Sequence, residues 1–327
     1  MRLVVQIPAL NEERTIAEVI RAIPAQIEGV DEIRVLVVDD GSSDRTAELA
    51  RAAGATVVRH AVSRGVGAAF RSGLGRADEM GADIILTIDA DGQFDAGDIP
   101  ALIRPILQGE ADFVTASRFA DPALVPQMPK AKRWGNDIIA RWLSSLVGQR
   151  FHDVSCGFRA YSKEAYFRLV LLGEFTYTHE TFLNLAFSGM RIQEVPVRVR
   201  GQREFGKSRV ASSLFGYGWR AASIILKTYR DYRPLRFFGF VAGANLVVAG
   251  CFFAFLLSYR LQHGMFTPFK WTGVTGLVLS GIAVSIFLMG VVAEMLDRVR
   301  ASQSELLYRL RRLERAVAGQ AGRGASS

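Results

Sequence analysis

The first 115 residues alternate short apolar runs with segments of helical periodicity. Apolar runs predict buried strands at 2–7, 33–38, 55–60, 83–89 and 112–117. Helical spacing of apolar residues, with polar starts and glycine ends, predicts helices at 11–23, 42–54, 65–81 and 95–109. Strands that alternate with helices indicate a mostly parallel sheet with helices on both faces. We therefore expect an α/β fold built on such a sheet.

The middle of the chain is less regular. Its pattern predicts helices at 131–148 and 178–189 and a strand at 191–200. From 210 to 232, apolar residues mix with basic ones as in helices that lie in a membrane interface. A helix packed on the folded core would show the same pattern, so both interpretations stay open.

Two later stretches, 237–259 and 271–293, contain no Asp, Glu, Lys or Arg. A helix needs roughly 20 apolar residues to cross a bilayer, so both are long enough, and a buried core helix is a weaker explanation. Basic residues precede the first stretch and follow the second, within a net charge of +8. The positive-inside rule then places both termini in the cytoplasm, with a hairpin through the membrane. Lipid explains this charge better than nucleic acid does.

The pattern divides the chain into four segments. We expect a folded α/β domain at 1–209, interface helices at 210–235, a membrane hairpin at 236–294 and a cytoplasmic helix with a disordered tail at 295–327. In the last segment Leu306, Leu310, Leu313 and Val317 form a stripe. A short coiled coil and a surface-lying helix both fit it. The oligomeric state stays open, with a homo-oligomer among the options.

Acidic residues follow two of the predicted strands. Asp39 and Asp40 come after 33–38, while Asp89, Asp91 and Gln93 come at and after the end of 83–89. Ligands of parallel α/β sheets bind at the carboxyl ends of strands. Two carboxylates and an amide oxygen suit Mg²⁺ or Mn²⁺. Turn formation explains the glycines at 41 and 92 but not the repeated pattern of an apolar strand followed by two acids.

Five motifs occur in the order and spacing of a known family. The segments "IPALNEE", "VVDDGSSDRT", "DADGQF", "ASRF" and "DVSCGFR" resemble those of family 2 glycosyltransferases. The likeness is greatest to polyprenyl-phosphate glycosyltransferases of the dolichol-phosphate mannose synthase type, and it covers roughly residues 3–230. It implies a GT-A fold, with a Rossmann-like sheet, that binds a sugar nucleotide and a divalent metal.

The resemblance also implies roles for individual residues. It implies a metal site at Asp89, Asp91 and Gln93, and catalytic roles for Asp89, Asp91, Arg118 and Asp153. The nucleotide-sugar contacts it implies are Pro8, Leu10, Glu12, Val37, Asp39, Asp89, Ala90 and Asp91. Many relatives have an aromatic residue where this chain has Leu10, so the base stays open. The acceptor-phosphate contacts it implies are Arg118, Arg133, Arg203, Lys207, Ser208 and Arg209.

The segment "GQREFGKS", residues 201–208, matches the P-loop pattern G-x-x-x-x-G-K-[ST]. Glu204 places a negative charge inside it, and no apolar strand ending in Asp follows to complete a Mg²⁺ site. The resembling family has its acceptor loop here. We therefore expect its Arg and Lys residues to bind the phosphate of a lipid rather than that of ATP or GTP.

These observations lead to one expected activity and two alternatives. We expect an inverting transfer of one sugar from GDP- or UDP-hexose to a polyprenyl phosphate, dolichyl or undecaprenyl, at the cytoplasmic face of the membrane. A membrane glycosyltransferase with a hydroxyl acceptor and a membrane P-loop NTPase or nucleotide-binding scaffold are the alternatives. A lipid phosphate is largely dianionic at pH 7 and needs no general base, unlike a hydroxyl.

Overall fold

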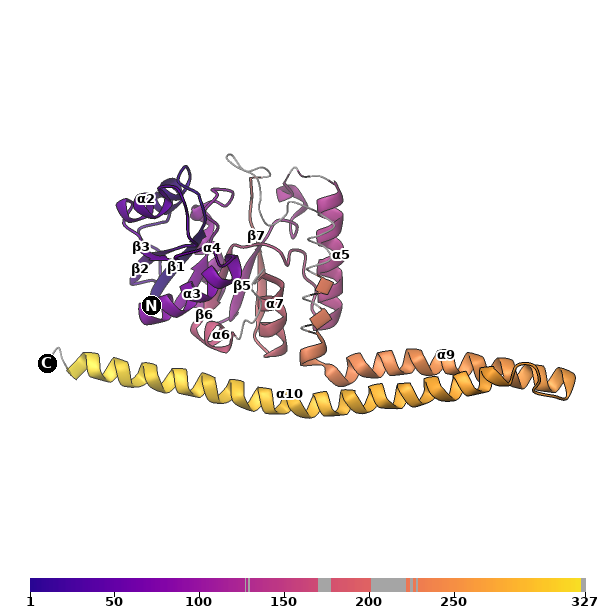
Figure 1. Ribbon diagram of the computed structural model, residues 1–327. Helices are drawn as coiled ribbons and strands as arrows, with labels where there is room; N and C mark the ends of the chain where they lie inside the picture. The colour runs from indigo at the N-terminus through magenta and orange to yellow at the C-terminus, as the bar shows by residue number, and fades with distance from the viewer. Residues whose placement is uncertain are drawn as a thin grey trace. The chain divides into compact units, whose positions relative to one another are not determined.

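The computed structural model describes residues 1–126, 128, 130–169, 178–200, 222–223, 226–227 and 229–324. The chain divides into two compact units, Met1–Ile225 and Leu226–Ser327. We call them the sheet unit and the hairpin unit. Figure 1 follows the chain through both by colour.

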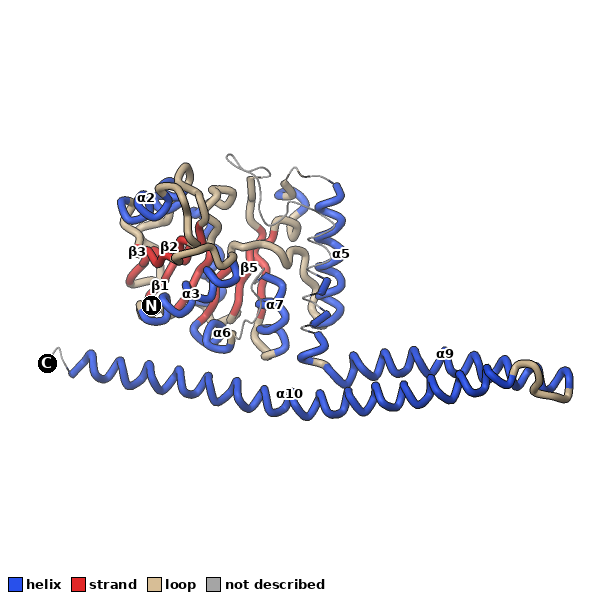
Figure 2. The backbone as a smooth tube through the Cα atoms, in the orientation of Figure 1, coloured by secondary structure: helices blue, strands red, loops and turns tan. Residues whose placement is uncertain are grey.

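The sheet unit is built on a seven-stranded sheet in the order β3-β2-β1-β4-β6-β5-β7. The strands are β1 (Arg2–Ala9), β2 (Glu32–Asp39), β3 (Thr56–Arg59), β4 (Ile84–Thr87), β5 (Phe113–Ser117), β6 (Arg159–Ser162) and β7 (Ile192–Pro196). All neighbouring pairs are parallel except those of β6, which runs antiparallel to both β4 and β5. Figure 2 shows the strands in red between helices in blue.

Helices connect the strands and cover the sheet. They are α1 (Ile16–Arg21), α2 (Thr46–Ala52), α3 (Val66–Glu79), α4 (Ile99–Leu107), α5 (Lys130–Val147), α6 (Lys163–Arg168) and α7 (Thr178–Phe187). Short 3-10 helices precede α4 and α5, at Ala96–Asp98 and Pro122–Leu124. Pro105 lies inside α4, which continues to Leu107.

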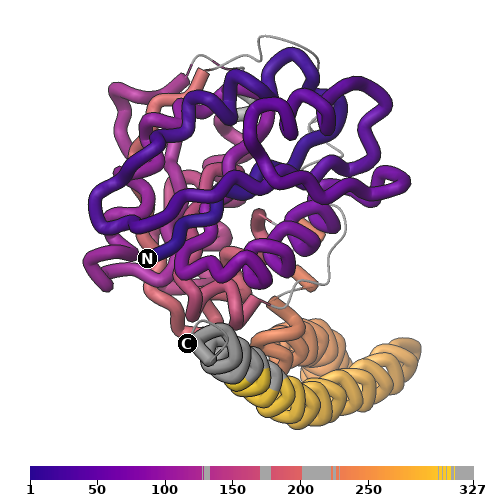
Figure 3. The backbone as a smooth tube through the Cα atoms, turned by 90° about the vertical axis from the view of Figure 1, so that its left-hand side faces the viewer, coloured from indigo at the N-terminus to yellow at the C-terminus, as the bar shows by residue number. Residues whose placement is uncertain are grey.

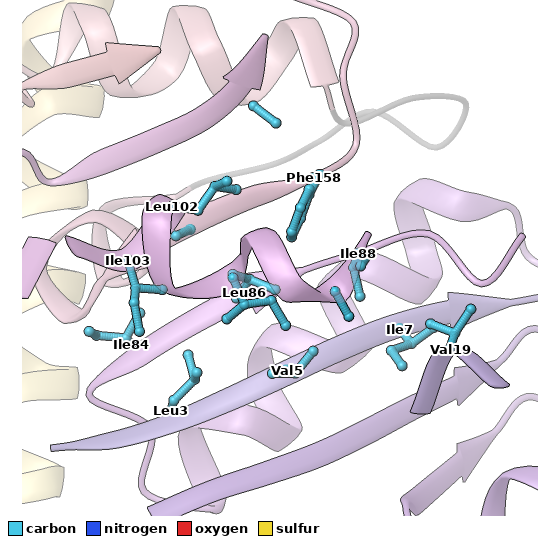
Figure 4. Close-up of a cluster of buried hydrophobic side chains, with 14 of the residues drawn as sticks. Leu3, Val5, Ile7, Val19, Ile84, Leu86, Ile88, Leu102, Ile103 and Phe158 are labelled. Carbon is cyan, nitrogen blue, oxygen red and sulfur yellow. The ribbon is translucent and has the colours of Figure 1, made fainter. Parts of the chain in front are cut away.

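The main hydrophobic core lies on one face of the sheet. Alternate residues of β1, such as Leu3, Val5 and Ile7, point into it together with Ile84 and Leu86 of β4. Helices α1 and α4 cover this face with aliphatic side chains, as Figure 4 shows for Val19, Leu102 and Ile103. This packing fixes the carboxyl ends of β1 and β4 next to each other.

The opposite face is covered by α3 and α7. The side chain of Gln6 points to this face, where its Nε2 donates to the Phe70 carbonyl of α3 at 3.0 Å. An aromatic cluster continues the face toward β5: Tyr161 packs on Phe70 and Phe113, and Phe113 packs on Phe182 of α7. The sheet is therefore buried on both sides.

The hairpin unit contains two long helices, α9 (Pro234–His263) and α10 (Lys270–Gly324). They run side by side in Figures 1 and 3. Pro234–His263 and Lys270–Arg300 are each long and apolar enough to cross a membrane. Gly276 allows close packing, because a Cβ there would lie 3.0 Å from the ring of Phe253.

The expected mostly parallel, Rossmann-like sheet is confirmed. Two elements were not expected from the sequence, the antiparallel strand β6 and the helix α6 that follows it. α10 is also longer than the expected span at 271–293, because it continues without a break into the segment that follows. The segments 201–209 and 210–221 lie outside the described residues.

Candidate active site

Three parallel strands end at the same edge of the sheet. β1 pairs with β2 up to Ala9 and Asp39, and with β4 up to Gln6 and Thr87. The loops that follow them are joined by hydrogen bonds. The hydroxyl of Thr15, at the start of α1, donates to the Ala90 carbonyl at 2.7 Å, and the Asn11 N–H donates to Ser42 Oγ at 2.9 Å. The segments predicted to bind nucleotide and metal therefore meet at one edge.

The residues predicted to contact the nucleotide occupy two neighbouring strand ends. Pro8 lies in β1, and Leu10 and Glu12 follow it, all three partly exposed. Val37 lies in β2 between β1 and β3, and its side chain is fully buried in the hydrophobic core. Asp39 ends β2 and is also buried; its Oδ1 accepts from the Ser42 N–H at 2.9 Å, and Arg59 Nε lies 3.1 Å from its Oδ2.

Asp40 fastens the loop after β3 to the end of β2. Its carboxylate accepts hydrogen bonds from the Ser63 hydroxyl at 2.8 Å and from the N–H groups of Arg64 and Gly65 at 2.9 and 2.8 Å. His60 Nδ1 lies 2.7 Å from the same carboxylate, and His60 Nε2 lies 2.9 Å from the hydroxyl of Ser72. Burial alone would raise the pKa of Asp40, but these hydrogen bonds outweigh it and lower that pKa.

The predicted metal residues follow β4. Asp89 is partly exposed, Asp91 is buried, and Asp91 Oδ1 accepts from the Gln93 N–H at 3.0 Å. Two hydrogen bonds join Gln93 to the segment that follows β7. Its Nε2 donates to the Arg200 carbonyl at 3.0 Å, and its carbonyl accepts from the Arg200 N–H at 3.0 Å. A bridge between Phe94 and Val199 extends this contact. The segment leading to residue 201 therefore begins beside Gln93.

Gly157 lies against the side-chain carboxylate of Asp89. A Cβ built at position 157 would lie 2.8 Å from each Asp89 oxygen and 3.0 Å from its Cγ. Contacts this short do not occur for real Cβ atoms, so the lack of a side chain at 157 leaves the room that the carboxylate occupies. Phe158 then packs against Phe94, with ring centroids 5.3 Å apart. The motif "DVSCGFR" therefore borders the acidic segment after β4.

The donor set at this edge fits Mg²⁺ or Mn²⁺. Both ions take oxygen ligands, and Mg²⁺ is often held by one or two carboxylates together with waters and substrate phosphates. Asp89 and Asp91 offer such carboxylates, and Gln93 offers an amide oxygen. Among the residues that the structure describes, no three His, Cys, Asp or Glu side chains form a ready cluster of ligands.

Arg118 and Asp153 form a buried ion pair with two parallel hydrogen bonds. Arg118 Nε donates to Asp153 Oδ2 at 2.6 Å, and Arg118 Nη2 donates to Oδ1 at 2.8 Å. The Asp153 side chain is fully buried, whereas that of Arg118 is 15% exposed. Burial would raise the pKa of Asp153, but the charge and hydrogen bonds of Arg118 outweigh it and lower that pKa. Asp153 is therefore held as a carboxylate whose oxygens already have partners.

Further hydrogen bonds hold the 152–155 segment in place. Glu194 of β7 accepts from the N–H groups of His152 and Asp153 and lies 2.8 Å from His152 Nδ1. Ser155 Oγ accepts from Arg118 Nη2 at 2.7 Å and donates to Asn136 Oδ1 of α5 at 3.1 Å. The Arg118 guanidinium is thus linked to helix α5 through one hydroxyl.

A hollow of about 760 Å³ lies between α5 and this segment. Arg133, predicted to bind phosphate, is exposed on α5 and lines it. Phe119 and His152, the immediate neighbours of Arg118 and Asp153, line it as well. The structure therefore brings Arg133 to the same side of the sheet unit as the Arg118–Asp153 pair.

A fully buried arginine lies beside the 152–155 segment. Arg159 of β6 is fully buried and donates to the carbonyls of Thr178 at 2.7 Å and Val154 at 2.9 Å. Its guanidinium lies 5.2 Å from the ring centroid of Phe182. Burial, and next to it the charge of Arg159, lowers the pKa of His179 to about 4. His179 is therefore neutral at physiological pH and enclosed in the interior.

Sequence reasoning did not single out several residues of this site. Arg159 is one, because an arginine at the start of a short strand is ordinarily placed on the surface. Thr15, His60, Ser155, Gly157 and Glu194 are others, since their contacts join segments far apart in the chain. The predicted phosphate contacts Arg203, Lys207, Ser208 and Arg209, and the P-loop match that contains two of them, lie outside the described residues.

Comparison with known proteins agrees with this geometry. The family model described as glycosyl transferase family 2 matches residues 4–169. The UDP-N-acetylglucosamine–dolichyl-phosphate N-acetylglucosaminyltransferase of Methanococcus voltae is 30% identical over 64% of this chain and 90% of its own. The undecaprenyl-phosphate 4-deoxy-4-formamido-L-arabinose transferase of Pseudomonas aeruginosa is 29% identical over 90% of this chain and 85% of its own.

A solved structure shows the same fold with ligands. Glucosyl-3-phosphoglycerate synthase from Mycobacterium tuberculosis, crystallised with Mn²⁺, UDP and glucosyl-3-phosphoglycerate, is 25% identical with a TM-score of 0.56. The match covers 69% of this chain and 79% of that one. The chain is therefore similar in fold to an enzyme that was crystallised with a divalent metal and a nucleotide.

Proposed function

The chain belongs to glycosyl transferase family 2, and we propose that it transfers a single sugar, with inversion, from a nucleotide sugar to a polyprenyl phosphate. The observation that carries the proposal is the state of Asp153. This carboxylate is fully buried, has a lowered pKa and is bound on both oxygens by Arg118. It is a poor proton acceptor, which favours an acceptor that is already ionised.

The donor would bind at the carboxyl edge of β1, β2 and β4. Pro8, Leu10, Glu12 and the backbone of Val37 would border the nucleotide, with Asp39 below it. Asp89, Asp91 and Gln93 would hold a divalent cation. Such a cation neutralises charge on a departing nucleoside diphosphate. The Ala90 carbonyl would go on accepting the hydrogen bond of the Thr15 hydroxyl, which holds the loop between Asp89 and Asp91 in place.

The acceptor needs no general base if it is a phosphate monoester. Its second pKa is near 6, so the monoester is largely a dianion at pH 7 and its oxygen can attack the anomeric carbon directly. The described histidines of the sheet unit are poorly placed as bases. His60 lies between Asp40 and Ser72, His152 is bound to Glu194, and His179 is buried in the interior. A hydroxyl acceptor would require a base in this region.

The attacking dianion and the donor diphosphate repel each other, so cations are needed between them. Arg118 supplies one, oriented by Asp153 and Ser155. Arg133 supplies another from the hollow beside α5. We assign the same task to Arg203, Lys207, Ser208 and Arg209, on the sequence alone. Asp153 acts in this account by positioning Arg118 and not by touching the substrate.

The hairpin unit would anchor the enzyme beside its lipid acceptor. Its two helices are long and apolar enough to be membrane spans. The distribution of Lys and Arg supports a cytoplasmic position for the sheet unit and both termini. The lipid phosphate would then meet the nucleotide sugar at the cytoplasmic surface.

The acceptor class can be tested by a matched pair of lipids. The purified full chain would be incubated with radiolabelled GDP- and UDP-sugars and either polyprenyl phosphate or the corresponding polyprenol. We expect one labelled lipid product with the phosphate and none with the alcohol. The product should release its sugar in mild acid, as a glycosyl phosphate does. Transfer to the polyprenol would support a hydroxyl acceptor instead.

A further inference from the structure

Helix α10 continues far beyond its apolar part. The candidate span ends at Arg300, whereas the helix ends at Gly324. No glycine or proline occurs between 294 and 318 to break it. At 1.5 Å per residue, the part after Arg300 is about 36 Å long. A helix that continues from a span in this way leaves the bilayer along the axis of the span and does not lie on the membrane surface.

α9 does not run alongside the extension of α10, whose first residues lie beside the segment before α9: the Arg300 guanidinium is 4.6 Å from the ring centroid of Tyr232. α9 begins at Pro234, level with Gly290 and Glu294 of α10: a Cβ at Gly290 would lie 2.8 Å from Phe238, and the Leu235 N–H lies 3.5 Å from Glu294 Oε2. Residues of α10 after 294 therefore extend past the start of α9.

An apolar stripe runs along this extension. Five of its members are each more than half exposed: Leu296 64%, Val299 55%, Leu306 60%, Leu310 54% and Leu313 62%. With Gln303, they alternate in spacings of three and four residues. This is the a and d pattern of a left-handed coiled coil, with Gln303 as the one polar a position. The charged residues Asp297, Arg298 and Glu305 lie at b and c positions, away from the stripe.

We propose that residues 296–317 of α10 form a parallel coiled coil with the same segment of a second copy of this chain. The inference rests on the membrane hairpin of the proposed function. Insertion would orient two copies alike and set their stripes at the same height above the bilayer, so the helices would be parallel and in register. The pattern is self-complementary, as a pair of identical helices requires.

Anchoring in one membrane allows even a short apolar stripe to form a dimer. About three heptads form a weak pair when both helices diffuse freely in solution. Two chains held in one membrane are at a much higher effective concentration, so a weak interface becomes sufficient. A polar residue at one a position also disfavours shifted registers, which is the role that Gln303 would take.

Cysteine cross-linking tests the pairing in the full chain. Cys251, exposed on α9, would be replaced by Ser, and Leu306→Cys, Leu313→Cys and Tyr308→Cys would be made singly. Leu306 and Leu313 occupy d positions, while Tyr308 is at f on the opposite side. In membranes treated with a mild oxidant, we expect covalent dimers at 306 and 313 and none at 308. Equal cross-linking at all three, or none at 306 and 313, would overturn the proposal.

Two further measurements separate this inference from the proposed function. The double variant Leu306→Asp/Leu310→Asp should be monomeric in nanodiscs, with half the protein mass of the wild-type dimer. The control Tyr308→Asp should keep the dimer mass. An unchanged mass in the double variant would contradict the coiled coil. Alkaline extraction tests the hairpin itself. A chain that is extracted but still cross-links at 306 and 313 would contradict the membrane anchor while supporting the pairing.

Discussion

Gly157 lies directly against the carboxylate of Asp89, with room for no atom between them. A Cβ at position 157 would come within 2.8 Å of both carboxylate oxygens. Neighbouring residues join the same segment to Arg118 through Asp153 and to the Gln93 region through Phe158. One short loop therefore sets the position of a proposed metal ligand and of a proposed phosphate ligand.

Gly157→Ala should weaken metal-dependent nucleotide binding. The added methyl group must displace Asp89 or the loop, at a cost of about 1–3 kcal/mol. We expect about a tenfold loss in affinity for a nucleoside diphosphate with Mn²⁺, corresponding to ~1.4 kcal/mol, measured by titration calorimetry. Gly75→Ala is the matched control, since nothing lies within 4 Å of a Cβ at that helical position.

A double mutant shows whether Asp89 is the cause. In an Asp89→Ala background the oxygens that clash with Cβ are gone, so Gly157→Ala should cost no further thermal stability. An equal loss of stability in both backgrounds would mean that Gly157 is needed for another reason.

Asp153→Asn should destabilise the sheet unit strongly. Removing one partner of a buried ion pair leaves the other charge uncompensated and typically costs about 3–5 kcal/mol. Asp137→Asn, which removes an exposed ion pair with Arg141, should have no measurable effect. Thermal unfolding of the two variants at pH 7 makes the comparison. Similar unfolding temperatures for both would contradict the assigned role of the Arg118–Asp153 pair.

The same pair predicts a pH dependence. The pKa of Asp153 is lowered from its ordinary value of 3.8, so the unfolded chain takes up this proton at a higher pH than the folded one. The stabilisation is therefore complete well above that value and is lost as pH falls through the lowered pKa. The stability difference between wild type and Asp153→Asn should be constant from pH 6 to 7 and shrink below about pH 4. A difference that grows in acid would reverse the sign and exclude this explanation.

Asp40→Ala should loosen the loop after β3. It removes the acceptor for three hydrogen-bond donors of Ser63, Arg64 and Gly65 and the partner of His60. The expected cost is on the order of 3 kcal/mol, or about 6–12 °C in Tm for a domain of this size. Asp31→Ala, at an exposed position, is the control and should leave Tm unchanged. Nucleotide affinity should fall as well, since the loop adjoins Asp39.

Lys207→Ala should separate the two substrates. If Lys207 binds the lipid phosphate, loss of a charge-assisted hydrogen bond should raise KM for polyprenyl phosphate about tenfold, ~1.4 kcal/mol. KM for the sugar nucleotide should change little. Glu204→Gln, three residues earlier in the sequence, removes a negative charge and should not raise the lipid KM. Equal effects of Lys207→Ala on both substrates would contradict this division of roles, and loss of an ATP or GTP hydrolysis activity would support the P-loop alternative.

The apolar strands and the acidic residues at their ends were predictable from the sequence. Buried parallel strands appear as continuous apolar runs, and Asp39 and Asp89 stand where those runs stop. The two apolar helices were predictable for the same reason, from their length without charge.

The strand β6 was not predictable in this way. It carries Arg159 and Tyr161 on a buried face, which hides the usual alternation of polar and apolar residues. Hydrogen bonds from Arg159 to the carbonyls of Thr178 and Val154 compensate for the burial of its charge. The sequence around Arg159 does not predict these partners. The Gly157–Asp89 contact was hidden for a similar reason, because it joins residues 68 positions apart in the sequence. The roles predicted for individual site residues stay predictions until the variants above are measured.

Metal-dependent transfer to polyprenyl phosphate tests the central claim most directly. Wild type, Asp91→Asn and the control Asp31→Asn would be assayed with labelled nucleotide sugar and polyprenyl phosphate, with Mn²⁺ and with a chelator. We predict lipid-linked product from the wild type and the control with Mn²⁺, at least a hundredfold less from Asp91→Asn (~2.7 kcal/mol in the barrier), and none with the chelator. Full activity of Asp91→Asn, or product formation that ignores the chelator, would contradict the account.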